Sequence, residues 1–157
     1  MEAISFDSLW LCVHLLWREG GAQRSTRGVR ACKSLLAALA KETTRIELRT
    51  LVLCTAFRNP ALIARMAVTD LSDSYGRVLL CLGAGYHAPE FRPFGYPYDH
   101  RMSRFEEALT IITTLLGEGQ MDFTGTYALA RTCEFRPREP RPGGQLINGC
   151  ALPGRRP

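Results

Sequence analysis

Several sequence patterns that mark common classes of protein are missing from this chain of 157 residues. Its six cysteines form no CxxC pair and no metal-ligand spacing, which argues against a metal site and favours a reduced, cytoplasmic protein. The apolar stretch of residues 9–16 follows acidic residues rather than a basic leader, so we expect no signal peptide. The same stretch is too short to cross a bilayer, and we expect no membrane partner.

Charge and motif content exclude further classes. The net charge is +5, yet the basic residues are scattered except in the stretch from Arg136, and no aromatic residues are interleaved with them. We therefore expect no nucleic-acid partner. The chain also contains no G-x-S-x-G motif for nucleophilic catalysis and no internal repeat. A single domain remains, whose 46% hydrophobic residues suffice to bury a core.

The most informative segment joins a short apolar strand to a glycine turn. Residues 78–82 are apolar without polar alternation, as in a parallel strand buried on both faces. Gly83-Ala84-Gly85 follow at its carboxyl end, and Tyr86 and His87 come next. Glycines at this position let backbone amides approach a flat or charged ligand. A tight turn that requires a positive φ is the alternative explanation, and both can hold together.

Strand and helix signals alternate along the chain, which is typical of a parallel sheet covered by helices. They predict strands over residues 8–13, 45–54 and 77–82, helices over residues 31–42, 60–72 and 103–116, a loop over residues 20–30 and a small hairpin over residues 121–129. Residues 136–157 hold five prolines and four glycines, which predicts a largely irregular tail. One last strand is expected to begin at Leu146 and Ile147.

Capping residues predict where two of the helices begin. Asn59 can cap a helix that has Pro60 at its first position, where the missing proline amide costs nothing. Ser103 and Glu106 have the spacing of a capping box at the start of the long helix, and Gly117 is expected to end it.

Three ordered segments resemble the bacterial luciferase-like monooxygenases, which use a flavin or the related deazaflavin coenzyme. The segment that begins GRVLLCLGAGYHAPEF and ends TGTYALA resembles the central part of that family. The upstream segment KSLLAALAKETTRIELRTLVLCTAFRNPALIARMA is similar in matching order, as is FDSLWLCVHLL near the amino end. Together the segments cover roughly residues 4–149.

The resemblance implies a (β/α)8 barrel, which takes about 250 residues when complete. We therefore expect an α/β fold that forms a partial barrel, truncated to about strands two to five, with the small hairpin as an insertion. Residues 1–149 would form this domain and residues 150–157 an irregular tail. Because a partial sheet has unpaired edges, we also expect a homo-oligomer or a complementing subunit.

The resemblance also implies an oxidoreductase that uses FMN or the reduced deazaflavin coenzyme (F-420 type) for monooxygenation or hydride transfer on a small-molecule substrate. His14 matches a histidine at the coenzyme face that can take part in proton transfer, although Val13 replaces the aspartate that usually precedes it. A partly buried packing histidine is the alternative. The coenzyme-binding candidates are Cys54, Thr55 and Ala56 after one strand and Gly83, Ala84, Gly85 and His87 after the next.

Three residues depart from the family pattern, because Arg49, Tyr75 and Cys81 stand where glycine is usual. An arginine within a barrel strand costs several kcal/mol unless it pairs or reaches water. The alternative function is therefore a non-catalytic remnant or a self-associating module.

Overall fold

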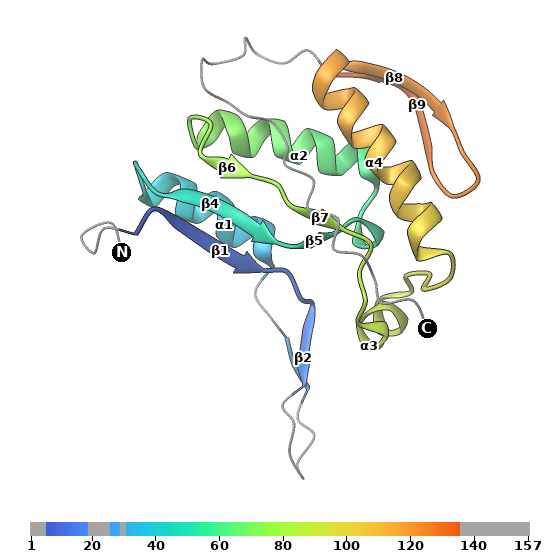
Figure 1. Cartoon of the computed structure of the whole chain (residues 1–157), viewed down its shortest axis with the longest axis horizontal. Helices are drawn as coiled ribbons and strands as arrows, with labels where there is room; N and C mark the ends of the chain where they lie inside the picture. Colours follow the sequence, from blue (N-terminus) through green and yellow to red (C-terminus); the bar gives the residue numbers. More distant parts are fainter. Residues whose placement is uncertain (1–5, 19–25, 29–30, 136–157) are drawn as a thin grey trace.

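Parallel strands form the centre of the computed structural model, which describes residues 6–18, 26–28 and 31–135 (Figure 1). β1 (Ser8–Cys12) pairs with β4 (Glu47–Leu51), and β4 also pairs with β6 (Val78–Leu79), so β4 lies in the middle. Farther along the same direction, β5 (Leu53–Cys54) and β7 (Leu82–Gly83) form a second parallel pair. The α/β class predicted from the sequence is confirmed.

One threonine divides the two longer predicted strands. The Thr50 hydroxyl donates to the Cys81 carbonyl and accepts the Cys81 amide, both at 2.9 Å. These side-chain bonds stand in for backbone ladder bonds, so the pairing of β4 with β6 stops and resumes as β5 with β7. The prediction of continuous strands over residues 45–54 and 77–82 is therefore wrong at this point.

Two helices connect the strands and lie alongside the sheet (Figure 1). α1 (Cys32–Glu42) buries Leu36 and Ala40 against the core. α2 (Pro60–Asp73) begins at the predicted cap, because the Asn59 side chain accepts two backbone amides at 2.9 and 3.2 Å. It ends one residue later than predicted.

The long helix α4 (Arg101–Glu118) begins two residues before its predicted start. His100 adopts a left-handed conformation with φ 48°, and its carbonyl accepts the Arg104 amide at 2.9 Å, so helical bonding already starts there. Ser103 and Glu106 consequently lie inside the helix, and the predicted capping box is wrong. The helix buries an apolar face that includes Phe105, Ile112 and Leu116.

A hairpin of β8 (Gln120–Thr124) and β9 (Leu129–Glu134) follows α4 as a separate two-stranded sheet, as predicted. Gly119, with φ 76°, ends α4 in place of the predicted Gly117, since it supplies the left-handed conformation that terminates the helix. Glu107 joins the hairpin to α4 because its carboxylate accepts the three consecutive amides of residues 126–128 at 2.8–2.9 Å.

A second antiparallel pair corrects the predicted loop over residues 20–30. β2 (Leu16–Arg18) pairs with β3 (Thr26–Gly28), so part of that loop is a strand. The strand predicted at Leu146 and Ile147, the irregular tail and the domain boundary after residue 149 lie outside the described residues. Within the described ranges, no helix is both long and apolar enough to cross a membrane, and no cluster of three or more metal-ligating side chains occurs.

Candidate functional site

The carboxyl ends of the parallel strands meet at the side of the sheet where α3 (Ala88–Phe91) lies (Figure 1). His14 follows β1, and the turn at residues 83–87 follows β7. The fold brings these distant segments into contact, since His14 Nδ1 lies 2.9 Å from Glu90 Oε2. On the other side of the same ring, Nε2 lies 3.5 Å from the Tyr86 hydroxyl.

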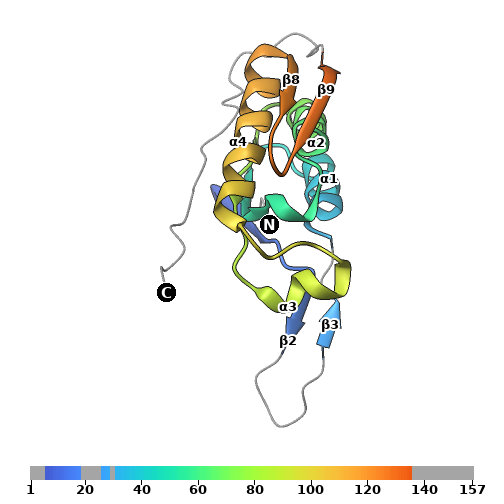
Figure 2. The same cartoon turned by 90° about the vertical axis from the view of Figure 1, so that its right-hand side faces the viewer.

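Glu90 is the centre of this contact, and its side chain is only 3% exposed. Its second carboxylate oxygen, Oε1, accepts the backbone amides of Leu15 and Leu16 at 2.6 and 3.1 Å. These bonds attach α3 to the start of β2, and Figure 2 shows the two elements next to each other. Burial alone would raise the pKa of Glu90, but the hydrogen bonds from His14 and the two amides outweigh it and lower the pKa.

Two further rings, those of Tyr86 and His87, lie next to His14. The His14 ring centroid lies 5.9 Å from that of Tyr86 and 6.0 Å from that of His87, both in edge-to-face geometry. Tyr86 is 72% exposed, so the cluster reaches the surface on its side. The predicted residues His14 and His87 are therefore adjacent in space.

Two of the three coenzyme-binding candidates that follow β5 have buried side chains. Cys54 is buried against Phe57 and Phe91, and burial raises the pKa of its thiol to about 11 despite opposing backbone hydrogen bonds. Thr55 is buried too, and its hydroxyl donates to the Gly83 carbonyl at 3.4 Å. Ala56 is half-buried beside the same aromatic side chains.

The glycines of the turn are required by the protein's own packing. A Cβ on Gly85 would lie 2.6 Å from Cys54 Sγ and 2.8 Å from Phe91 Cζ, and its φ of +78° disfavours any side chain. A Cβ on Gly83 would lie 2.9 Å from Val52 Cγ2. The tight-turn explanation therefore accounts for Gly85 without a ligand, and Ala84 between them is half-buried.

Glu90 is the site residue that the sequence analysis missed. The replacement of aspartate by Val13 was the available signal, because it left His14 without a neighbouring carboxylate. The carboxylate instead comes from a residue 76 positions away. Such a separation has no local sequence signature. Arg101, which donates to the Gly85 carbonyl at 2.7 Å and stacks on Tyr98, holds the turn in a similarly non-local way.

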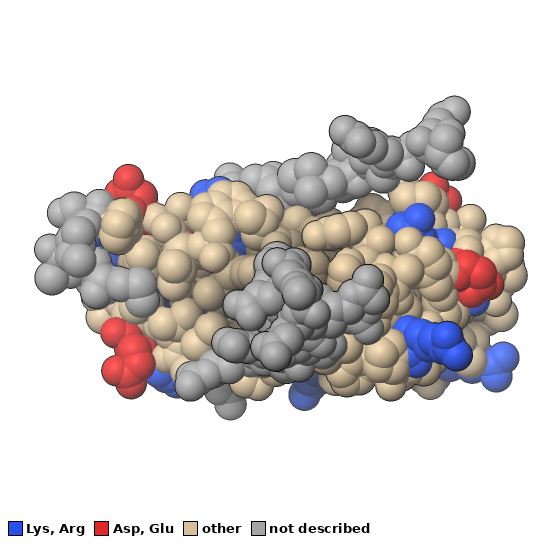
Figure 3. All heavy atoms as spheres, turned by 90° about the horizontal axis from the view of Figure 1, so that it is seen from below, with Lys and Arg blue, Asp and Glu red and all other residues tan. Residues whose placement is uncertain are grey.

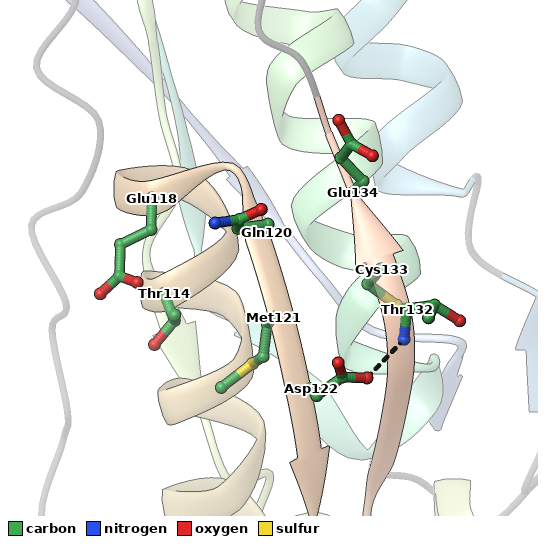
Figure 4. A pocket seen from close by; sticks show the side chains of 8 residues that line it. All are labelled: Thr114, Glu118, Gln120, Met121, Asp122, Thr132, Cys133 and Glu134. Atoms are coloured by element: carbon green, nitrogen blue, oxygen red, sulfur yellow. Dashed lines mark hydrogen bonds between the residues drawn. The ribbon is translucent and has the colours of Figure 1, made fainter.

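Two hollows lie on the described surface. One, of about 570 Å³, lies between α4 and the hairpin (Figure 4) and is lined by Thr114, Glu118, Gln120, Met121, Asp122, Thr132, Cys133 and Glu134. The other, of about 560 Å³, lies beside α3 and is lined by Ala88, Phe91, Arg92, Gly95, Tyr96, Pro97 and Tyr98. Neither includes a predicted site residue.

Comparison with known proteins identifies relatives of this chain. The chain is 31% identical over 158 aligned positions to an F420-dependent glucose-6-phosphate dehydrogenase of Amycolatopsis mediterranei, covering 93% of this chain and 46% of that protein. It is 36% identical over 114 positions to the pyrimidine monooxygenase RutA of Cronobacter turicensis, covering 69% of this chain and 30% of that protein. The chain thus spans less than half the length of these relatives.

The fold has relatives among solved structures. An F420-dependent secondary alcohol dehydrogenase, solved with an F420-acetone adduct, superposes with a TM-score of 0.71 at 25% identity, covering 87% of this chain and 41% of that one. The sequence profile described as luciferase-like monooxygenase matches residues 1–153. The chain belongs to the luciferase-like monooxygenase family.

Proposed function

We propose that this chain carries part of the coenzyme site of a flavin- or deazaflavin-dependent oxidoreductase that acts on a small molecule. The observation that carries the proposal is the meeting of His14 with the turn at residues 83–87 at the carboxyl end of the sheet, where barrel enzymes bind their ligands. We also propose that the described fold is part of a (β/α)8 barrel, corresponding to about its second to fifth strands. Residues 1–149 would form that domain.

The residues present fit one edge of a planar ring system rather than a whole coenzyme. Cys54 and Phe91 occupy the space beside Gly85 on the protein side. This packing keeps the Gly85 backbone in place at the surface of the turn. The groups left to face a ring are the main chain of Ala84 and Gly85 and the rings of His14, Tyr86 and His87. Cys54, Thr55 and Ala56 would contribute main-chain contacts only, because the first two side chains are buried.

Each group has a distinct part in the proposed site. The main chain of the turn would set the position of the ring, and the Arg101 bond to the Gly85 carbonyl keeps that main chain fixed. His14 would hold or accept a proton next to the reacting carbon. The coenzyme, when bound, supplies hydride transfer or oxygen activation, as is usual for cofactor enzymes.

A second chain is proposed to complete the site. Among the described strands, β1 and β6 each have one neighbour, so the sheet has two unpaired edges. Trp10, on the edge strand β1, is 44% exposed. Exposed apolar side chains next to an unpaired edge favour association, either with a second copy or with a complementing subunit.

The competing candidate, a non-catalytic remnant or self-associating module, is favoured by one observation. The turn glycines are explained by packing against Val52, Cys54 and Phe91, so they need no coenzyme. For the same reason a Gly85→Val variant would disrupt the turn whether or not a ligand binds, and it cannot test the site.

The proposal is tested by titrating the purified chain with FMN and, separately, with the deazaflavin coenzyme, while following coenzyme fluorescence. We expect saturable binding that His14→Asn weakens by about fivefold or more, equivalent to about 1 kcal/mol. His100→Asn is the matched control, because His100 is exposed, stacks on Tyr127 and lies outside the His14 cluster. Asparagine also tolerates the left-handed backbone of that residue.

Size-exclusion chromatography with an absorbance scan completes the experiment. A defined oligomer that carries the coenzyme supports the enzyme. A folded chain that binds neither coenzyme, or a colourless aggregate, would refute the proposed function and leave the remnant.

A further inference from the structure

The two ring nitrogens of His14 have different surroundings. Nδ1 lies 2.9 Å from Glu90 Oε2, deep in the protein. Nε2 points the other way and lies 3.5 Å from the hydroxyl of the exposed Tyr86, at the outer limit of a hydrogen bond. In a neutral imidazole one nitrogen carries the proton and the other accepts one, so these surroundings decide which form is present.

The state of Glu90 determines the choice. Its Oε1 accepts the Leu15 and Leu16 amides at 2.6 and 3.1 Å, and such donors favour the charged form. Burial acts the other way, but the net shift of the Glu90 pKa is downward, so the group is a carboxylate at neutral pH. A carboxylate only accepts hydrogen bonds. The hydrogen in the 2.9 Å contact must therefore belong to His14 Nδ1.

We propose that Glu90 is a positioning residue that fixes His14 as the Nδ1–H tautomer and leaves Nε2 as the proton-accepting atom of the site, next to the Tyr86 hydroxyl. When Nε2 takes a proton, the resulting imidazolium lies against the Glu90 carboxylate, which stabilises its charge. Tyr86, exposed at the surface, connects Nε2 to solvent. Glu90 thus supplies from α3 the carboxylate that Val13 does not supply from β1.

This inference deepens the proposed function. It rests on that function only for the role of the His14 proton in the reaction. The tautomer itself is a property of the coenzyme-free protein. Its failure and a failure of coenzyme binding are therefore separate results.

The test is NMR of the ring nitrogens in chain labelled with 15N-histidine, at a pH where the imidazoles are neutral. The chain has only three histidines, so the His87 and His100 signals serve as internal references. We expect His14 to be protonated on Nδ1 and bare on Nε2. A wild-type spectrum with the proton on Nε2 would overturn the proposal without any variant.

Glu90→Gln provides the decisive comparison. The glutamine oxygen can still accept the Leu15 and Leu16 amides, while its NH2 group now faces Nδ1 as a donor. We therefore expect His14 to switch to the Nε2–H tautomer, with the other two histidines unchanged. An unchanged His14 in a folded Glu90→Gln chain would show that Glu90 only ties down the backbone.

Two further variants complete the design. Glu107→Gln also alters a carboxylate that accepts backbone amides, but Glu107 bonds to the hairpin turn, so His14 should keep its tautomer. Tyr86→Phe removes only the hydroxyl near Nε2 and should leave Nδ1 protonated. If Glu90→Gln does not fold, Tyr86→Phe decides: a switch of tautomer there assigns control to Tyr86 and overturns the proposal.

Discussion

Tyr75 adopts a backbone conformation that side chains disfavour. Its φ is 56°, in the left-handed region, where it follows α2 and leads towards β6. The ring is 75% exposed, so little burial offsets this conformation. The sequence identified Tyr75 as a replacement for a family glycine, and the structure gives the physical reason for that glycine.

Tyr75→Gly should therefore stabilise the chain. Removing the Cβ from a left-handed residue relieves on the order of 1 kcal/mol. Urea unfolding followed by circular dichroism would measure the gain. Tyr75→Ala is the control, because it removes the ring but keeps the Cβ, and it should give no comparable gain. Equal stabilisation by both variants would show that the ring, and not the backbone, is responsible.

Arg49, the second departure from the family pattern, meets the condition that an arginine within a strand must pair or reach water. Its guanidinium bonds to the Glu47 carboxylate, with Nε at 3.1 Å, and lies 4.9 Å from the Trp10 ring centroid. Its side chain is also partly exposed. Because Arg49 both pairs with a carboxylate and reaches the surface, it avoids the cost of an unpaired buried arginine.

Single residues were predictable from the sequence where their partners are close along the chain. Asn59 caps a helix by accepting amides two and three residues away, so the local sequence contains both the capping residue and its partners. His14 was selected from a resemblance, whereas its partner Glu90 arrives through the fold. The chemistry of the site depends on that second kind of contact.

At the scale of elements, one buried ion pair joins α1 to α2. Lys33 and Asp70 bond to each other, and both side chains are almost fully buried. Lys33 lies in the first turn of α1 and Asp70 in the last turn of α2, so each charge sits at the helix end whose dipole disfavours it. The two charges therefore depend on each other.

Asp70→Asn should lower the free energy of unfolding by about 3–5 kcal/mol, since it leaves the Lys33 ammonium buried without a countercharge. The double variant Lys33→Met with Asp70→Leu should recover most of the loss, because it removes both charges and keeps apolar volume. Chemical denaturation of the three chains measures both effects. A loss below about 1 kcal/mol in Asp70→Asn would contradict the pairing.

The type and order of the elements could be predicted from periodicity, but several boundaries could not. The strands were divided because Thr50 bonds to Cys81 across the sheet, and α4 starts early because His100 takes a left-handed conformation. Neither the Thr50 hydrogen bonds nor the His100 conformation changes the hydrophobic pattern from which the elements were predicted. Boundaries set by one side chain or one dihedral angle are visible only in the structure.

At the scale of the whole molecule, charge lies at the periphery of the face seen from below in Figure 3. Lysine, arginine and acidic side chains gather towards its two ends, and uncharged residues occupy most of the visible middle. Carboxylates that accept backbone amides also join separate segments of the chain. Glu90 joins α3 to the β1–β2 connection, and Glu107 joins α4 to the hairpin.

Low pH should therefore reduce the stability of the fold, because it protonates Glu90. Because its pKa is lowered in the folded chain, its contribution to stability is complete above the ordinary glutamate value of about 4.3 and is lost as the pH falls through the lower folded value. Thermal unfolding at a series of acidic pH values should show a shallower pH dependence in Glu90→Gln than in the wild type. Glu106→Gln, which alters an exposed glutamate of α4, should leave the slope unchanged.

The close packing around Gly85 limits what this glycine can show about the evolutionary history of the chain. Since Cys54 and Phe91 already occupy the space a side chain would need, selection for folding alone is enough to keep this glycine. An active enzyme and a silent copy would retain it equally well. The presence of Gly83 and Gly85 therefore indicates common descent but not retained activity, and evidence of activity has to be sought in residues that folding does not require.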